Sequence, residues 1–343
     1  MRKILWSILI FLLFVVAFFA WKIFGPATHS PEGNFFYIRT GSNYTEVKKH
    51  LLENKILRST TWFDMISKRA GYKIIKPGKY EVNNGMSIFE LVRMLKNGRQ
   101  TPVNLTIIKF RTKEEFARKI GKEFETDSVE MNLFLTNNDT LKHYQLDTNT
   151  WTCAIIPDTY IYFWNSTPTK IFSKLYEASQ KFWTPEKKQA ATKHGISTCE
   201  AYTLASIIEE ETNLKDDKGK IASVYLNRIK KGMPLQADPT LKFAMRAFAL
   251  KRIYEKDFAY KSPFNTYLNK GLPPGPICTP SRETIEEVLN SPETDYIYFV
   301  ANSDFSGSHI FSTNYAEHQK LAATYHQALD KQDSIRKARQ NSQ

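Results

Sequence analysis

The chain has 343 residues, of which 42% are hydrophobic and 24% charged, and its formal net charge is +13. This composition is typical of globular proteins and excludes wholesale disorder, while the length favours a small module plus a larger one. A positive charge of this size suits nucleic acid, anionic lipid headgroups or an acidic extracellular polymer. The basic residues are scattered along the chain, without the basic and aromatic run of a nucleic-acid site.

Residues 4–21 carry no charge and are flanked by Arg2, Lys3 and Lys22. A spanning helix needs roughly 17–25 apolar residues, so this segment predicts a single-pass transmembrane anchor. A cleaved secretory signal is the alternative, but its apolar region is usually about 7–15 residues long and ends at a site of small residues. The positive-inside rule places the N-terminus in the cytoplasm and the chain after residue 25 outside the cytoplasmic (inner) membrane, in the periplasm. Export disfavours a nucleic-acid partner.

A small α+β module is predicted for residues 34–100, after a linker that contains proline and glycine. Its elements are a strand at 34–39, a helix from 43, a helix at 60–70, a strand at 79–82 and a helix at 87–97. Ser87 with Glu90 has the spacing of a capping box at a helix start, and Gly98 is a typical helix stop. The order of elements is strand, two helices, strand and helix.

The second module is mainly helical, with a few strands and long loops. Its predicted elements are a strand at 101–110, helices at 170–182, 198–212 and 218–231, a loop-rich stretch at 233–280, a strand at 296–301 and a helix at 316–332. Residues 160–164 are ambiguous, and the polar tail is expected to fray. The predicted boundaries are 1–24 for the cytoplasmic tip and anchor, 25–33 for the linker, 34–100, 101–332 and 333–343 for the tail.

Three consecutive glutamates end the predicted helix at 198–212. On a helix, Glu211 shares a face with Leu204 and Ile208, so it points toward the apolar side. It also lies in the last turn, where the helix dipole disfavours a negative charge. A carboxyl group that stays protonated near neutral pH suits a general acid. For Glu209 and Glu210 we expect a solvated acidic face, as in most acidic runs.

Polar groups recur in four loop segments, at residues 235–240, 262–267, 271–276 and 307–309. Amide, hydroxyl and aromatic groups on rigid turns are what a sugar site needs, because sugars present many hydroxyls and flat apolar faces. Each segment alone is weak evidence. Asp238 precedes a proline, which is common in turns, His309 has an alternative structural role, and the proline and glycine run is typical of scaffolding.

The three cysteines, Cys153, Cys199 and Cys278, are too few and too widely spaced to predict a disulfide framework. No Cys and His spacing resembles a zinc site. We therefore expect no structural metal and no cofactor.

Several motifs resemble the endolytic murein transglycosylase (YceG-like) family. They lie, in the family's order, at residues 205–212, 221–228, 232–240, 265–267 and 271–276. Residues 36–98 resemble the family's LysM-like subdomain more loosely, and residues 157–160 resemble another family segment. The chain has Thr152 and Cys153 where the family usually has Glu-Gly, and Asp217 and Lys218 replace Glu-Arg, which puts bidentate arginine contacts at that point in doubt.

The resemblance implies non-hydrolytic cleavage of the β-1,4 bond between N-acetylmuramic acid and N-acetylglucosamine, leaving 1,6-anhydromuramoyl ends, on nascent glycan strands. It makes Glu211, the glutamate before threonine in the Glu-x-Glu-Thr motif, the catalytic residue. Gln236, Asp238, Asn265 and Tyr267 are the candidates for binding the sugar. The family also suggests the cytoplasmic membrane and peptidoglycan synthases as partners.

Two other functions remain open at this stage. One is a hydrolase in which Glu211 and Asp238 form the usual pair of carboxylates. The other is a non-catalytic scaffold that binds the cell wall through the LysM-like module.

Overall fold

The computed structural model describes residues 2–250 and 252–340, and the chain divides into two compact units. The first unit runs as far as Leu105 and also takes in Ile120–Asp127 and Ile161–Pro168. The second unit comprises Thr106–Lys119, Ser128–Tyr160 and the residues from Thr169 onward.

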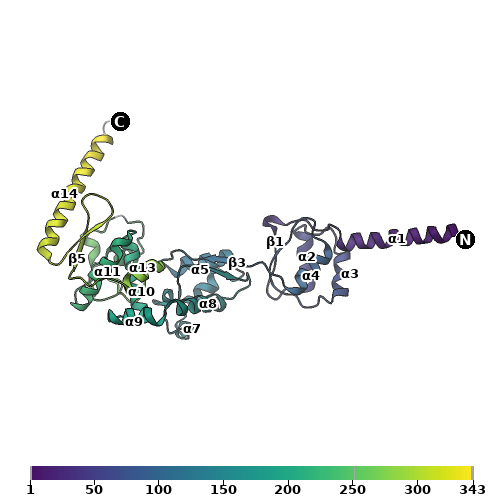
Figure 1. Ribbon diagram of the computed structural model, residues 1–343, viewed down its shortest axis with the longest axis horizontal. Coiled ribbons are helices and arrows are strands. Elements are labelled where there is room, and N and C mark those ends of the chain that lie inside the picture. The colour runs from purple at the N-terminus through teal and green to yellow at the C-terminus, as the bar shows by residue number, and fades with distance from the viewer. Residues whose placement is uncertain (1, 251, 341–343) are drawn as a thin grey trace. The chain divides into compact units, whose positions relative to one another are not determined.

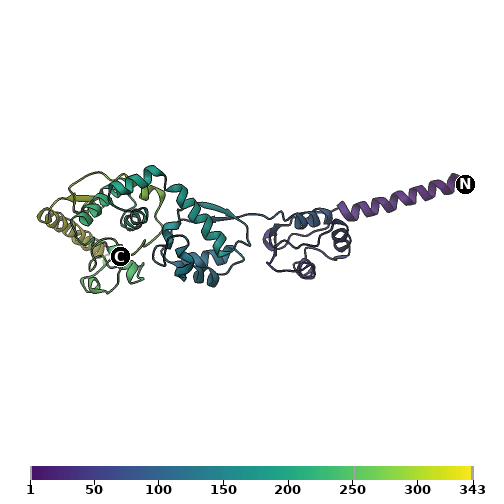
Figure 2. The ribbon, with the colours of Figure 1, turned by 90° about the horizontal axis from the view of Figure 1, so that it is seen from below.

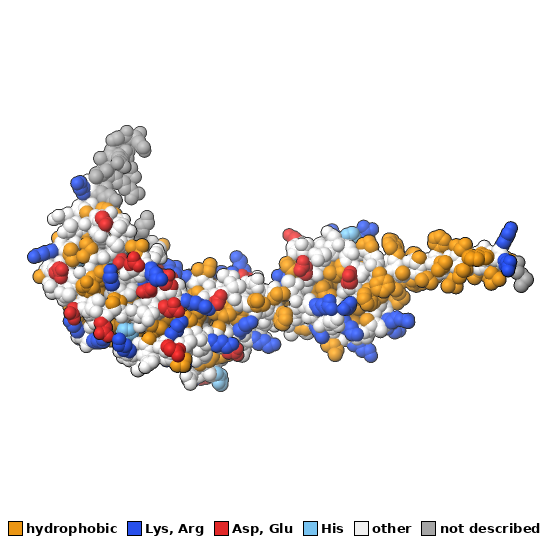
Figure 3. All heavy atoms as spheres, viewed as in Figure 1, with side chains coloured by type: hydrophobic (Ala, Val, Ile, Leu, Met, Phe, Trp, Pro, Cys, Tyr) orange, Lys and Arg blue, Asp and Glu red, His pale blue; other side chains and the backbone are white. Residues whose placement is uncertain are grey.

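Helix α1 (Arg2–Phe24) opens the first unit and confirms the predicted N-terminal helix. Both Figure 1 and Figure 2 show it extending as a single helix from the small globular part of this unit. In Figure 3 its surface is covered by hydrophobic side chains, with basic side chains at its N-terminal tip. Within the described residues it is the one helix that is long and apolar enough to cross a membrane.

The rest of the first unit is a small α+β fold with the predicted order of elements. They are the short 3-10 helix η1 (Glu32–Asn34), β1 (Phe35–Ile38), α2 (Tyr44–Glu53), α3 (Thr61–Ala70), β2 (Gly78–Glu81) and α4 (Ile88–Asn97). Strands β1 and β2 pair in an antiparallel sheet, with Phe36 opposite Tyr80. The alternate residues of both strands that face the helices are buried, as the period of a half-buried strand requires.

Local sequence signals set the helix ends of this fold. The side chain of Ser87 accepts a hydrogen bond from the Glu90 amide while the Glu90 carboxylate accepts one from the Ser87 amide, so the predicted capping box is confirmed. Gly98 ends α4 in the left-handed conformation that glycine adopts without cost. The buried side chains of Leu51, Phe63 and Leu91 belong to the core between the helices and the sheet.

The remaining elements are more numerous than the sequence predicted. In chain order they are β3 (Val103–Thr106), α5 (Lys113–Glu123), α6 (Ser128–Thr136), α7 (Asn138–Lys142), the 3-10 helix η2 (Trp151–Ala154), β4 (Thr159–Tyr162), α8 (Pro168–Phe182), α9 (Pro185–Lys193), α10 (Thr198–Glu211), α11 (Lys215–Lys230), α12 (Asp238–Ala244), the 3-10 helix η3 (Glu255–Ala259), α13 (Arg282–Leu289), β5 (Tyr298–Ala301), β6 (His309–Ser312) and α14 (Tyr315–Gln340). Strands β3 and β4 pair with each other, as do β5 and β6. The fold is thus helix-rich with short strands.

Helix α10 lies at the centre of the second unit and packs against α11, α12 and α13. All of its residues from Ala201 to Ile208 are buried, which is unusual for a helix that ends in three glutamates. A capping box between Ser197 and Glu200 begins the helix. Because the helix is buried on every side, the position of its last turn is set by the surrounding core rather than by solvent.

Several expectations about these elements are wrong in detail. The predicted strand at 101–110 is limited to β3, because the backbone beyond it bonds elsewhere and the Phe110 amide donates to the hydroxyl of Thr279. The loop-rich stretch at 233–280 contains α12, where Pro239 near the helix start favours a helical turn. Helix α14 continues through the expected frayed tail as far as Gln340, since this tail is rich in good helix formers. Residues 341–343 lie outside the described residues.

The cysteines also differ from the expectation. Cys153 in η2 and Cys199 in the first turn of α10 form a disulfide that closes a sequence separation of 46 residues. Cys278 is free and buried. The number and spacing of the cysteines did not predict this disulfide, because a single long-range bridge leaves no spacing pattern in the sequence.

Candidate active site

Glu211 is the last residue of α10, at the point where the helix leaves the core. Its side chain is only partly exposed, and its Oε1 accepts a hydrogen bond of 2.7 Å from the hydroxyl of Tyr225 on the neighbouring helix α11. Tyr225 is itself buried. The predicted apolar placement of Glu211 is therefore confirmed, and the carboxyl group has a fixed orientation.

Burial is the main cause of an unusual ionisation at this position. Removal from water raises the pKa of Glu211 from its ordinary value to about 7. The hydrogen bond from Tyr225 opposes this rise because it stabilises the carboxylate, while the negative charge of Asp238 adds to it. A carboxyl group with this pKa is partly protonated at neutral pH and can both give and take a proton.

The two preceding glutamates have a different environment. Glu210 forms two hydrogen bonds with the guanidinium of Arg111, of 3.1 Å to Nε and 2.9 Å to Nη2, and lies 3.4 Å from the ammonium of Lys109. Glu209 accepts from the hydroxyls of Ser281 and Thr284 and also lies within ion-pair distance of Lys109 and Lys218. The expectation of a solvated acidic face is wrong, because both carboxylates are held in interior ion pairs.

Glu211 thus differs from its neighbours in forming no ion pair within the described residues, although the positive charge of Lys242 acts on it and opposes the rise of its pKa. Among residues 2–250 and 252–340 no ion pair reaches its carboxyl group. The three adjacent glutamates therefore differ in their surroundings: Glu209 and Glu210 tie α10 to neighbouring elements through ion pairs, whereas Glu211 faces a cavity.

Glu211 opens into a cavity of about 360 Å³. The other residues that line it come from α11, the loop before α12, α12, the loop after η3, strands β5 and β6, and α14: Arg228, Leu235, Gln236, Asp238, Tyr267, Phe299, Val300, Ala301, His309 and His318. Polar groups therefore face the carboxyl group from several elements, and Phe299 adds an aromatic ring. This mixture suits a sugar, which has both hydroxyls and apolar faces.

Three of the four predicted sugar-binding residues line this cavity. Asp238 begins α12, and its Oδ1 accepts a hydrogen bond of 2.5 Å from the hydroxyl of Tyr267. Burial, together with this bond, raises the pKa of Tyr267 well above its ordinary value, so the phenol remains a donor. Gln236 has a positive φ of 52°, a conformation that is strained for a residue with a side chain and often marks a functional site.

The structure places the fourth residue, Asn265, behind the cavity wall. Its side chain is buried, and its amide nitrogen donates to the carbonyl groups of Phe258 and Tyr260. Its oxygen accepts a hydrogen bond of 2.9 Å from the amide of Tyr267. Asn265 therefore shapes the loop that carries Tyr267 and is separated from the space next to Glu211.

Arg228 has a structural role that the sequence did not predict. Its guanidinium donates 2.7 Å hydrogen bonds to the carbonyl groups of Ile297 and Leu235, which ties the loop before α12 to the start of β5. Burial lowers its pKa, although the carbonyl partners keep the buried cation hydrogen-bonded. The only signal in the sequence was its place in the segment 221–228.

Two histidines complete the wall. His309, on β6, contacts Asp217 through its backbone amide at 2.8 Å and through Nδ1 at 3.0 Å, so its ring orientation is fixed. His318, on α14, stacks on the ring of Tyr298, and burial lowers its pKa. Within residues 2–250 and 252–340 no group of three or more His, Cys, Asp or Glu side chains could hold a metal ion.

The hydrogen bond from Tyr225 gives a direct test of the ionisation of Glu211. Activity that requires the protonated acid should be present at low pH and be lost as the pH rises through about 7. In Tyr225→Phe the carboxylate loses its donor, so this loss should move to higher pH by roughly one unit, as expected for one hydrogen bond to a charged group. The measurement is the pH dependence of the enzyme's activity.

Tyr202→Phe is the matched control for this experiment. Tyr202 is a buried tyrosine on α10 whose hydroxyl donates to the carbonyl of Ile155, so its removal costs a similar buried hydrogen bond. It should leave the pH profile in place. Equal profiles for Tyr225→Phe and the wild type would contradict the proposed control of Glu211.

The sequence is similar to known proteins over most of its length. The sequence model of the YceG-like family matches residues 36–324. The chain is 31% identical over 313 residues to the endolytic murein transglycosylase of Bacillus subtilis, with 84% of this chain and 83% of that protein covered. It is 26% identical over 324 residues to the endolytic murein transglycosylase of Streptococcus pneumoniae serotype 2, of which it covers 57%.

A solved structure shows the same similarity in three dimensions. The crystal structure of a putative YceG-like protein from Listeria monocytogenes matches with a TM-score of 0.55 and 27% sequence identity. The match covers 84% of this chain and 98% of the Listeria chain.

Proposed function

Because the chain belongs to the YceG-like family, we propose that it is a lytic transglycosylase that cuts the glycan strands of peptidoglycan, with Glu211 as its general acid and base. The observation that carries this proposal is the environment of Glu211. The Glu211 carboxyl group has a pKa of about 7, forms no ion pair within the described residues, and opens into a polar and aromatic cavity. These are the properties that proton transfer to and from a sugar requires.

The proposed reaction cuts the β-1,4 bond between N-acetylmuramic acid and N-acetylglucosamine. Glu211 donates its proton to the leaving oxygen as the bond to C1 of the muramoyl sugar breaks. The C6 hydroxyl of the same sugar then attacks C1, and its proton passes to the Glu211 carboxylate. The product has a 1,6-anhydro end, no water is consumed, and Glu211 returns to its protonated form.

A single acid and base is sufficient for this reaction because the nucleophile belongs to the substrate. Glycosidases that use water need a second carboxylate to activate it or to attack the sugar. Asp238 is the candidate for that second role, since it lines the same cavity. One of its oxygens is occupied by Tyr267, so we assign to this pair the stabilisation of the positive charge that develops on the sugar ring.

The remaining groups position the sugar. Gln236 presents its side chain at the cavity from a strained backbone, and Tyr267 offers an aromatic face as well as a hydroxyl. Asn265 supports them indirectly by holding the Tyr267 loop. Action on nascent strands and contact with peptidoglycan synthases are further parts of the proposal, and they rest on the family resemblance.

The chemistry of the new strand end tests the function. Purified peptidoglycan treated with the enzyme should yield strands with 1,6-anhydromuramoyl ends, which mass spectrometry separates from reducing ends because they lack one water. Reducing ends would favour the hydrolase that uses Glu211 and Asp238. Binding of glycan without any new ends would favour a scaffold that binds through the first unit, which we propose to be a LysM-like module.

We also propose that α1 anchors the enzyme in the cytoplasmic membrane, with both globular units in the periplasm. The basic side chains at the N-terminal end of α1 support this orientation. The disulfide between Cys153 and Cys199 supports it independently, because disulfides persist in the periplasm and are rare in the cytoplasm.

Membrane washing tests the anchor. The protein should remain in the membrane fraction after high-salt and alkaline washes, because a spanning helix is not released by screening of surface charge. A protein held by its positive charge alone would appear in the soluble fraction after the salt wash.

A further inference from the structure

The segment that follows α1 is bound closely to the first unit. The amides of Ala27 and Thr28 donate to the carbonyl of Met86 at 3.3 and 3.1 Å, and the amide of His29 donates to the carbonyl of Ile56 at 2.9 Å. The side chain of Thr28 donates to the carbonyl of Asn83 at 2.8 Å. The residues that the sequence suggested as a linker therefore fix the end of α1 against the turn before α4.

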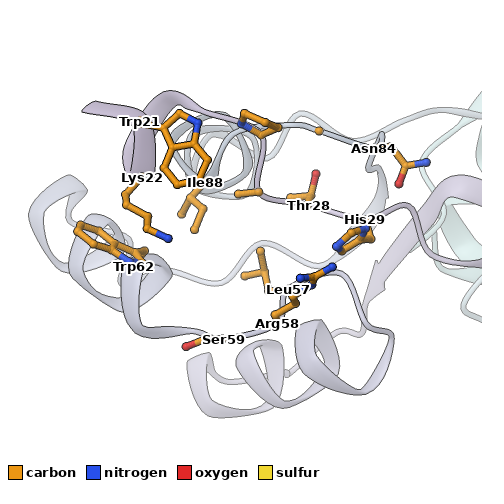
Figure 4. Close-up of a pocket in the computed structure, with 13 residues that line it drawn as sticks. Trp21, Lys22, Thr28, His29, Leu57, Arg58, Ser59, Trp62, Asn84 and Ile88 are labelled. Atoms are coloured by element: carbon orange, nitrogen blue, oxygen red, sulfur yellow. The ribbon is translucent and has the colours of Figure 1, made fainter. Parts of the chain in front are cut away.

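This arrangement leaves an open cavity of about 610 Å³ between the end of α1 and the small α+β fold. Figure 4 shows its lining residues, which come from the end of α1, the segment at residues 26–29, the loop before α3, α3, the turn before α4 and the start of α4. They are Trp21, Lys22, Pro26, Ala27, Thr28, His29, Leu57, Arg58, Ser59, Trp62, Asn84, Gly85 and Ile88. The cavity lies wholly within the first unit and is distinct from the space beside Glu211.

The charged side chains that line this cavity are all basic. Lys22 and Arg58 both line it, and no acidic side chain does. Within residues 2–250 and 252–340, Arg58 forms no ion pair or side-chain hydrogen bond, and the ammonium of Lys22 has aromatic rings as its neighbours, at 5.0 Å from Trp21. Ser59 and Asn84 add polar groups to the lining. Two cations without carboxylate partners favour an anionic ligand.

The other part of the wall is apolar and continues the surface of α1. Trp62 contacts Phe18 and Phe19 of α1, with ring centroids 6.4 and 5.5 Å apart. Leu57 and Ile88 line the cavity floor and are buried. Tryptophans and basic residues at the end of a spanning helix are typical of the headgroup level of a bilayer. If α1 spans the membrane, the cavity opens at that level.

We propose that this cavity binds an anionic phospholipid of the outer face of the membrane, with its headgroup in the space lined by Lys22, Arg58 and Trp62. The proposal rests on α1 as a membrane anchor, which the washing experiment tests separately. A lipid fits better than a wall polymer because the cationic groups lie next to an apolar wall that is continuous with the spanning helix. The lipid would hold the first unit against the membrane surface.

The test uses the full chain, purified in a neutral detergent, and native mass spectrometry with added phosphatidylglycerol or phosphatidylcholine. The wild type should retain phosphatidylglycerol in preference to phosphatidylcholine. Arg58→Gln and Lys22→Gln should each weaken phosphatidylglycerol binding about fivefold, the effect expected for one basic residue near an anionic lipid. Arg69→Gln is the matched control, because Arg69 is an exposed arginine of α3 that does not line the cavity.

The outcomes separate the possible occupants. Loss of binding in the two cavity variants with normal binding in Arg69→Gln supports the site. Equal retention of both lipids, or an equal loss in Arg69→Gln, overturns it and indicates general surface attraction. Displacement of the lipid by soluble glycerol phosphate at similar concentration, or by muropeptide fragments, overturns the lipid assignment in favour of a free phosphate or a wall ligand.

Discussion

Replacing Glu211 with glutamine should abolish glycan cleavage while the protein stays folded. The change keeps the shape of the side chain and its hydrogen bond with Tyr225, but it removes the transferable proton. Since the same group supplies both the acid and the base step, turnover should fall by more than the roughly 10²–10⁴-fold expected for one step of general acid and base catalysis. Turnover on purified glycan strands is the measurement.

The stability of this variant should change in the opposite direction from its activity. The folded state raises the pKa of Glu211, so the ionised carboxylate is disfavoured on folding, and this cost is fully present at pH values above about 7. Glutamine removes the cost. At pH 8 the thermal midpoint of Glu211→Gln should therefore equal or exceed that of the wild type.

Glu210→Gln is the control, and we expect the opposite pattern from it: lower stability with unchanged activity. This change removes the partner of a bidentate arginine, so it should lower the thermal midpoint while each folded molecule keeps its turnover. Glu209→Gln should behave in the same way because it leaves Lys218 with one acidic partner fewer. Wild-type turnover in Glu211→Gln, or an inactive Glu209→Gln beside an active Glu211→Gln, would show that the wrong glutamate has been assigned.

Removal of the disulfide should have the largest effect on stability. The bridge closes a separation of 46 residues and ties the first turn of α10 to η2, so replacing both Cys153 and Cys199 with alanine should lower the free energy of unfolding. The chain-entropy argument gives a loss of about 2–4 kcal/mol. Urea denaturation, monitored by the helical circular dichroism signal of the chain, measures this loss of unfolding free energy.

A reducing agent separates the bridge from side-chain packing. The wild type should lose stability on reduction, whereas the double variant should not respond. Cys278→Ala is the matched control, since it removes a buried cysteine that is outside the bridge and should leave the response to reduction intact. A double variant as stable as the oxidised wild type would mean that the bridge contributes nothing to the fold.

The parts of the site that the sequence predicted are those governed by local spacing. Glu211 could be assigned from its place on the apolar face of a helix and in its last turn, and the helix starts followed from capping residues. Gln236, Asp238 and Tyr267, which line the cavity, were singled out because they lie in polar loops within the family motifs. The cavity joins these segments through long-range packing.

The features that the sequence did not predict depend on long-range packing. Tyr225 reaches Glu211 because α10 and α11 pack together, and His318 reaches the same cavity from a helix more than a hundred residues away in sequence. Asn265 and Tyr267 are both polar and nearly adjacent, but a loop has no periodicity to show which one faces the cavity. The same limit applies to the disulfide, because its two cysteines are brought together only by the folded core.

The docking of the α1 end has a consequence for any shortened form of the enzyme. Ile23 packs against the core of the first unit, and Phe24 contacts Phe89. A protein cut before Gly25 loses these neighbours, and Trp62 and Phe89 then face water. We expect such a fragment to self-associate through this uncovered surface as its concentration rises, so its oligomeric state in solution would reflect the cut rather than the anchored molecule.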